Sequence, residues 1–221
     1  MWFGKSVMGA VGGILFSSVG AFAGVTELVT NGSFESPVVS GSFQQFTAGI
    51  PGWTGSAGIE IQTNGALGAG QGTAFGNQYV ELGVESPSTY SQTLATIAGT
   101  TYDYSFYLSA RPGTGTNTVS VGLTGNASTT FSAADTGAVN FEKFTGTFVA
   151  TGSNSVLSFT PVNLADPGAG DLLDNVSVTA STGSGSTAVP LPPAVWSGFI
   201  GLAGITGFGL LRKVRHGAKE N

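Results

Sequence analysis

Cysteine is absent from this sequence of 221 residues, and histidine occurs once, as His216 near the C-terminus. Without cysteine the chain can form no disulfide, thiol nucleophile or thiolate metal site. A single histidine close to one end excludes multi-histidine zinc sites and histidine-activated nucleophiles from the rest of the chain. The commonest cysteine and histidine chemistries are therefore excluded before any fold is considered.

Charged residues are also scarce, at 9% of the chain, and they are unevenly placed. Five of the seven cations lie in the two ends of the chain, at Lys5, Arg212, Lys213, Arg215 and Lys219. Between residues 24 and 193, eleven acids stand against only Arg111 and Lys143, which gives a net charge of −9. A stretch this acidic repels nucleic-acid phosphates and can attract divalent cations. We therefore expect no nucleic-acid partner.

The residues that are abundant favour strands. The chain has 36 Gly and 15 Phe, so it has turn formers and enough apolar bulk for a core. Apolar and polar residues alternate most clearly over residues 101–109, which is the pattern of a strand with one buried face. Similar runs over several further segments, separated by Gly- and Pro-containing turns, predict an all-β, antiparallel jelly-roll β-sandwich. The other expected strands are residues 57–62, 78–82, 89–96, 117–124, 141–150, 155–160 and 172–179.

The N-terminus has the features of a secretory signal peptide. Lys5 precedes an apolar run over residues 7–16, and small residues stand at Ala21 and Ala23. Signal peptidase accepts small side chains at these two sites, so we predict cleavage after Ala23 and a signal peptide over residues 1–23. The alternative is that these residues form a buried helix of the mature fold. The predicted β-sandwich domain then covers residues 24–180.

The C-terminal part is predicted to cross a membrane. A Gly/Ser/Thr linker over residues 181–188 is followed by a Pro motif at 189–193 and an apolar segment at 194–211. Eighteen helical residues reach about 27 Å, close to the thickness of a bilayer's hydrocarbon core. Arg212, Lys213 and Arg215 then form a membrane stop, which would hold the tail over 212–221 in the cytoplasm by the positive-inside rule.

This tail resembles the PEP-CTERM sorting signal in its Val-Pro-Leu-Pro variant. The residues that carry the resemblance are Val189, Pro190, Leu191, Pro192 and Trp196, followed by the Gly-rich span and the basic end. The resemblance implies processing by an exosortase, with transient anchoring in the inner membrane before release to the cell surface or extracellular matrix. Leu191 replaces the glutamate of the eponymous triplet, which leaves the exosortase subtype open. An ordinary anchor that is never processed is the alternative.

The segment over residues 27–180 resembles galactose-binding-like β-sandwiches. The resemblance rests on the order of short fragments, among them Asn31-Gly-Ser-Phe-Glu35, Ile50-Pro-Gly-Trp53 and Leu173-Asp174-Asn-Val176. Similar domains include carbohydrate-binding modules and a cell-wall-associated family of unknown function. The resemblance implies a structural calcium ion held by Glu35 and Asp174, with Asn31 as a weaker helper. The alternative is that Glu35 is a strand-end charge and Asp174 a turn cap.

Sugar binding needs an aromatic platform beside a few planar polar groups. The possible platforms are Tyr107, Tyr79, Tyr90 and Trp53, and the possible polar partners include Gln92 and Arg111. We expect Tyr107 to be exposed, because it lies on the polar face of its strand. Trp53 has a core position as its alternative. An extracellular polysaccharide is the expected partner.

Paired carboxylates would be needed for glycoside hydrolysis. Glu60, Glu81 and Glu85 are available, but the sequence places them only near one another along the chain. We therefore expect a non-catalytic protein. Two classes remain open: a glycan-binding surface protein, and a structural or adhesive coat protein with no defined sugar ligand.

Overall fold

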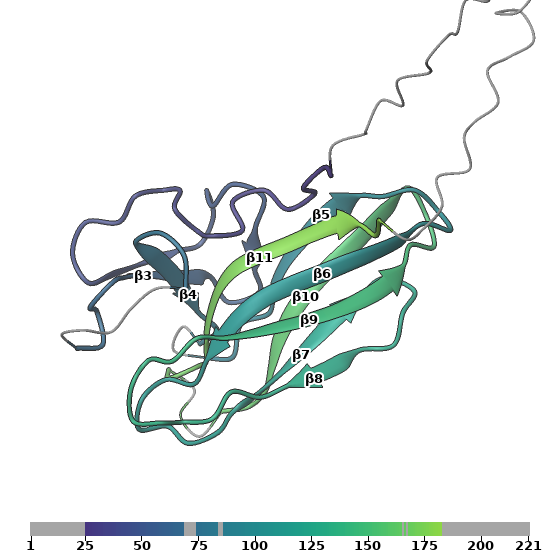
Figure 1. Cartoon of the computed structure of the whole chain (residues 1–221). Helices are drawn as coiled ribbons and strands as arrows, with labels where there is room; N and C mark the ends of the chain where they lie inside the picture. Colours follow the sequence, from purple (N-terminus) through teal and green to yellow (C-terminus); the bar gives the residue numbers. More distant parts are fainter. Residues whose placement is uncertain (1–24, 69–73, 84–85, 165, 167, 183–221) are drawn as a thin grey trace, which may run out of the picture. The chain divides into compact units, whose positions relative to one another are not determined.

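The computed structural model describes residues 25–68, 74–83, 86–164, 166 and 168–182, and within them the chain forms strands and no helix (Figure 1). No helix in this part of the chain is long and apolar enough to cross a membrane. The strands are β1 (Phe43–Phe46), β2 (Thr54–Gly55), β3 (Ile59–Thr63), β4 (Gln78–Glu81), β5 (Tyr90–Ala95), β6 (Thr101–Ser109), β7 (Thr118–Leu123), β8 (Thr129–Phe131), β9 (Glu142–Val149), β10 (Asn154–Asn163) and β11 (Leu172–Ala180).

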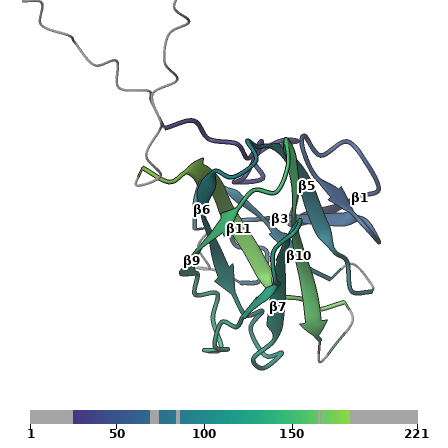
Figure 2. The same ribbon diagram turned by 90° about the vertical axis from the view of Figure 1, so that its right-hand side faces the viewer.

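The strands form two antiparallel sheets. Sheet A has the order β1-β3-β4-β11-β6-β9, and sheet B has the order β2-β5-β10-β7-β8. Figure 2 shows the two layers from the side, with β9, β6 and β11 in one layer and β5, β10 and β7 in the other. Because neighbours within a sheet are rarely consecutive in the chain, the chain passes repeatedly between the layers. The predicted all-β sandwich of antiparallel sheets is confirmed.

Alternation along the strands places the core between the sheets. On β6, Tyr102, Tyr104, Phe106 and Leu108 are buried, whereas the residues that alternate with them point to the outer face of sheet A. Phe106 lies at the centre of the core. Its ring centroid is 5.1 Å from those of Phe131 and Phe159. Phe106 on β6 of sheet A thus packs against β8 and β10 of sheet B.

All eight segments expected to be strands are strands in the structure, with ends that differ by at most three residues. The structure adds β1, β2 and β8. Two of these have only two or three residues, and the side chains of β1 are mostly exposed, so neither length nor alternation marks them in the sequence.

The two described ends of the domain lie side by side. Glu27 forms a bridge with Thr179 of β11, and Leu28 N donates to Val178 O at 2.9 Å. The Glu27 carboxylate also accepts Val178 N at 2.8 Å and the Ser177 hydroxyl at 2.5 Å. The N-terminal segment is thereby fixed to the last strand, and residues 25–182 contain both sheets and their shared core.

Several predictions fall outside the described residues and remain predictions. They concern the signal cleavage site, most of the linker, the Pro motif, the apolar segment over 194–211 and the basic tail. The residues are Ala21, Ala23, Val189, Pro190, Leu191, Pro192, Trp196, Arg212, Lys213 and Arg215.

Candidate functional site

Trp53 belongs to the core and is not a sugar platform. It is almost fully buried, and its ring centroid lies 5.2 Å from that of Phe34 and 6.2 Å from that of Phe159. Its indole Nε1 donates to the carbonyl oxygen of Asn31 at 3.1 Å, which satisfies its polar atom inside the fold. The platform prediction for Trp53 is therefore wrong, and the alternative position in the core is correct.

Tyr79, Tyr90 and Gln92 are also wrong as ligand-binding residues, because none is accessible. The Tyr90 hydroxyl donates to the Glu81 carbonyl oxygen and accepts Glu60 N at 3.1 Å. Gln92 uses both ends of its amide on the backbone of Thr30, at 2.6 and 2.9 Å. Tyr90 therefore joins the two sheets, and Gln92 fixes the N-terminal segment.

The two carboxylates predicted to bind calcium meet on one segment, residues 74–78. Glu35 Oε1 accepts Asn77 N and Gln78 N at 2.9 and 2.8 Å, and Asp174 Oδ2 accepts Phe75 N at 2.8 Å. Burial raises the pKa of Asp174 to about 7, against the backbone N–H groups that lower it, and the charge of Glu35 adds to the rise. The charge and proximity of these two groups fit a cation.

Asn31 does not fit the calcium set. Its amide is committed to Ser36, with Nδ2 donating to the carbonyl oxygen at 2.6 Å and Oδ1 accepting the backbone N–H at 3.1 Å. The described residues also contain no group of three or more Asp, Glu, His or Cys side chains placed to hold a metal. Any shell around Glu35 and Asp174 would need backbone carbonyls or water to complete it.

A polar cleft lies on the outer face of sheet A, over β1 and β3. Its volume is about 400 Å³, within the range of roughly 300–1,000 Å³ that is common for small-molecule sites. Sheet register explains the lining: Gln45 pairs with Glu60, and Phe43 pairs with Gln62, so all four side chains share one face. The other lining residues are Ser42, Ala66, Leu67, Arg111 and Gly168.

The floor of the cleft is a hydrogen-bonded network that ends on two carboxylates. Glu60 and Glu81 are directly opposite on β3 and β4. Gln62 Nε2 donates to Glu60 Oε1 at 2.8 Å and also to Glu81 Oε2. Gln45 Nε2 donates to Glu60 Oε2 at 3.0 Å. The amide nitrogens of Gln45 and Gln62 thus both donate to carboxylates.

Arg111 forms one wall and pairs with Glu81. Its Nη1 donates to Glu81 Oε1 and, at 3.4 Å, to the carbonyl oxygen of Gly168. This is the one ion pair among the described residues. Burial raises the pKa of Glu81 to about 7, and it outweighs Arg111 and the Gly170 N–H, which lower the pKa. Arg111, a predicted polar partner of a glycan, thus lines the cleft, and its role in binding stays a prediction.

Two buried polar atoms at this floor have no hydrogen-bond partner among the described residues: Gln62 Oε1 and the Tyr79 hydroxyl. Gln62 and Tyr79 are opposite each other on β3 and β4. Burial and the charge of Glu81 raise the pKa of Tyr79 to about 12. Buried polar atoms without partners are rare in folded proteins, so Gln62, which lines the cleft, is a candidate for a hydrogen bond to a water molecule or a ligand.

The exposed aromatic residue of the cleft is Phe43, which the sequence analysis did not select. Its side chain is 56% exposed and lines the cleft beside Gln45. Residues 43–46 read Phe-Gln-Gln-Phe, which does not alternate, and β1 has only four residues, so no pattern in the sequence marks Phe43. Tyr107 does not line this cleft; it is half-buried, with Lys143 Nζ 5.9 Å from its ring centroid.

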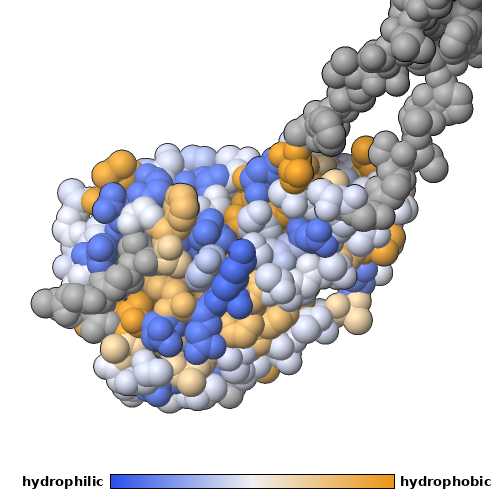
Figure 3. Space-filling model, viewed as in Figure 1, coloured by the Kyte–Doolittle hydropathy of each residue, from blue (hydrophilic) through white to orange (hydrophobic). Residues whose placement is uncertain are grey.

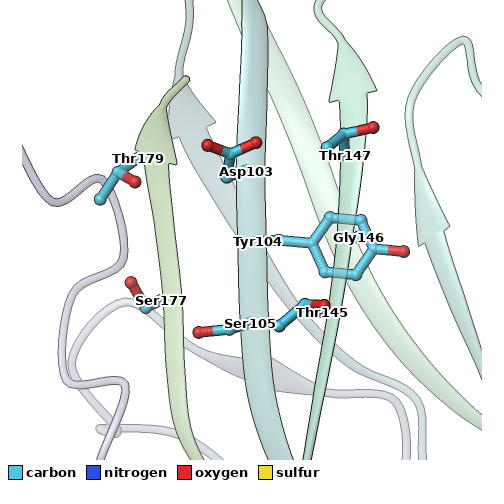
Figure 4. A pocket seen from close by; sticks show the side chains of 8 residues that line it. All are labelled: Asp103, Tyr104, Ser105, Thr145, Gly146, Thr147, Ser177 and Thr179. Atoms are coloured by element: carbon cyan, nitrogen blue, oxygen red, sulfur yellow. The ribbon is translucent and has the colours of Figure 1, made fainter. Parts of the chain in front are cut away.

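A second hollow of about 350 Å³ lies at the other end of the same face. Figure 4 shows Ser and Thr side chains from β11, β6 and β9 around Asp103, and the Tyr104 ring reaching across Gly146. That ring lies 2.3 Å from the position of a Cβ at residue 146, so the glycine makes room for tyrosine. Asp103 already accepts the Ser181 hydroxyl at 2.6 Å. None of the described residues that line this hollow has a buried polar atom without a hydrogen-bond partner.

The chemistry available at the cleft is recognition of a hydroxyl-rich ligand by an aromatic face and polar groups. Figure 3 shows this side of the molecule, where a band of hydrophilic residues runs next to apolar ones. Glu60 and Glu81 are close enough to resemble an acid/base pair, but the Glu81 side chain is fully buried and bonded to Arg111, Gln62 and Gly170. Glu85 lies outside the described residues.

Comparison with known families gives one match, to a model described as "Protein of unknown function (DUF642)", over residues 27–179. These are nearly the residues over which the sequence resembles galactose-binding-like sandwiches. No curated protein matches the chain.

Solved structures that resemble the chain include a Stig cyclase from Fischerella sp. TAU, at 18% identity over 71% of this chain and 98% of that chain, with a TM-score of 0.49. Another is the CBM22-1 xylan-binding domain from Paenibacillus barcinonensis, at 16% identity over 64% and 97%, with a TM-score of 0.43. A third is TmCBM61 in complex with β-1,4-galactotriose, at 13% identity over 71% and 99%, with a TM-score of 0.47. These identities and TM-scores are too low to carry a function from those proteins to this chain.

Proposed function

The chain belongs to DUF642, a family of proteins of unknown function. We propose that its β-sandwich is a non-catalytic glycan-binding domain of an exported surface or extracellular-matrix protein. The cleft over β1 and β3 is the proposed binding site. The observation that carries the proposal is the combination of exposed Phe43 with the unpartnered amide oxygen of Gln62 in one polar cleft.

These groups suit a sugar. A pyranose ring presents an apolar face of C–H groups and a rim of hydroxyls. Phe43 offers the ring to stack on, and Gln45, Glu60 and Gln62 offer planar acceptors for hydroxyl donors. Arg111 can donate to ring or hydroxyl oxygens from the wall. The carboxylates are held by hydrogen bonds in fixed positions, which favours binding over proton transfer.

The proposal of export rests on the ends of the sequence. Signal peptidase would remove residues 1–23, the span over 194–211 would anchor the chain in the inner membrane, and an exosortase would act near 189–193. β11 runs from Leu172, beside Glu81, to Ala180, a separation of about 26 Å at roughly 3.3 Å per residue. The cleft thus lies far along the domain from the residues that lead into the tail.

Glycan-array binding by the domain over residues 24–188 tests the proposal. We expect selective binding to a polysaccharide, with about tenfold lower affinity after Phe43→Ala because the stacking surface is lost. Ile97→Ala is the matched control. Ile97 is also an exposed apolar side chain, and it lies at the other end of the domain, where its N–H binds the Tyr102 hydroxyl.

Uniformly flat array signals from a folded domain would overturn glycan binding. The protein would then be a structural or adhesive coat component. Equal losses in Phe43→Ala and Ile97→Ala would keep glycan binding but place it elsewhere on the domain.

A further inference from the structure

The two carboxylates at the floor of the cleft are poorly balanced in charge. Glu60 and Glu81 face each other across β3 and β4 and share one neutral donor, Gln62 Nε2. Arg111 pairs with Glu81, but within the described part of the chain the Glu60 carboxylate accepts hydrogen bonds only from the amides of Gln45 and Gln62. When both carboxylates are ionised, the cluster of three charges sums to −1, at a site where Glu60 is only 7% exposed.

One polar atom of this floor that has no partner among the described residues, Gln62 Oε1, is a hydrogen-bond acceptor. The Gln62 amide must turn its nitrogen to the two carboxylates, since its oxygen would be repelled by both. Among the described residues its oxygen then has no partner, although Gln62 is only 3% exposed and lines the cleft. A ligand group that donates hydrogen bonds would satisfy it.

A neutral hydroxyl would satisfy the Gln62 oxygen but would leave the charge of Glu60 unbalanced. An ammonium group does both, because it has three donors and a positive charge. The surrounding field acts in the same direction, since residues 24–193 carry a net charge of −9 and attract cations over long range. A uronate or sulfate group would meet the opposite field.

Building on the glycan-binding function proposed above, we infer that the cleft selects glycans with free amino groups, that is, de-N-acetylated amino sugars. The ammonium group would lie between Glu60 and the Gln62 amide oxygen. Phe43 would cover the apolar face of the same sugar or its neighbour. N-acetylation would remove both the charge and two of the donors.

Isothermal titration of the domain over residues 24–188 tests this inference. The probes are tetrasaccharides of equal length: β-1,4-linked glucosamine, its N-acetylated form, cellotetraose and a uronic acid tetramer, all at low ionic strength. We expect the glucosamine tetramer to bind at least tenfold more tightly than the N-acetylated and neutral tetramers, with no binding of the uronic acid tetramer. Added salt should reduce this preference.

Two variants and one control assign the effect to the cleft. Glu60→Gln should reduce the preference for the amino sugar to less than about twofold. Gln45→Lys should do the same without altering a buried residue, because exposed Gln45 is 3.0 Å from Glu60 and a lysine there supplies its own ammonium. Glu142→Gln changes the net charge equally from an exposed position on β9 and should keep the preference.

The other possible results distinguish failure of the amino-sugar inference from failure of the glycan-binding proposal. Equal affinity for glucosamine and neutral tetramers would overturn the amino-sugar inference and leave glycan binding intact. An equal loss of preference in Glu142→Gln would also overturn it, because the effect would then be overall charge. Binding of none of these tetramers, together with flat glycan arrays and a folded domain, would overturn both.

Discussion

The buried carboxyl group of Glu81 should make this domain less stable as the pH rises through neutrality. Burial is the main cause, and it raises the pKa of Glu81 from 4.5 to about 7. Between these values the folded protein holds a proton that the unfolded chain releases. Stability is therefore fully present below pH 4.5 and is lost as the pH rises through 7. Asp174 and Asp171, whose pKa values burial raises to about 7 and about 6, act in the same direction.

The size of the effect follows from the gap between the folded and unfolded pKa values of Glu81. Each pKa unit corresponds to about 1.4 kcal/mol, so this group alone accounts for roughly 2–3 kcal/mol of unfolding free energy between pH 5 and pH 8. Urea unfolding at fixed ionic strength in EDTA, at several pH values, measures it. Glu81→Gln removes the titrating group and should reduce the pH-dependent loss by about this amount.

Glu142→Gln is the control, because Glu142 is exposed and should leave the pH dependence unchanged. The absolute stability of Glu81→Gln can also fall, since Arg111 loses its partner, so the readout is the slope with pH. A wild-type stability that is constant or rises from pH 5 to pH 8 would refute the reasoning. So would an unchanged slope in Glu81→Gln.

Three further predictions concern the core, the calcium pair and the tail. Phe106→Ala should destabilise the domain by about 3–5 kcal/mol in urea unfolding, because four aromatic rings pack around it; a loss below 1 kcal/mol would contradict its central place. Calcium should raise the thermal unfolding midpoint of the wild-type domain but not of Asp174→Asn, and the absence of any shift on adding EDTA to the calcium-loaded domain would rule the site out. Mass spectrometry of the secreted protein from cells with an active exosortase should find no C-terminus at Asn221; recovery of the intact end would indicate an unprocessed anchor.

Strands were predictable because their signal is local. The alternation over residues 101–109 and 118–123 directly reports which side chains face the core. β3 and β4 have an alternating sequence too, but both of their faces are buried. β2 pairs with β5, which lies far from it in the chain, and β8 pairs with β7, from which a turn separates it. With only two and three residues, β2 and β8 are too short to show an alternating pattern. Pairing partners are a long-range property, so such strands are decided by the fold.

The candidate site was less predictable, for the same reason. Tyr79 lies on the polar face of β4, where alternation predicts exposure, yet it is fully buried and its ring packs 5.6 Å from that of Phe141 on a distant segment. Conversely, Gln62 on β3 becomes part of a cleft only because β1 and Arg111 border it. Arg111 was selected on residue type alone, and its partner Glu81 is set by the packing of the loop after β6.

The sequence by itself determined the chemistry that this protein lacks, the acidic character of its central domain, the strand pattern and the motifs at its two ends. All of these depend on residue type and on spacing along the chain. Only the tertiary structure decided which aromatic residues are buried, that Asn31 binds Ser36 while Glu35 and Asp174 approach each other, and that Phe43, Glu60 and Gln62 share a cleft. Burial and proximity are set by sheet register and by covering segments far away in the chain, which alternation within one strand does not encode.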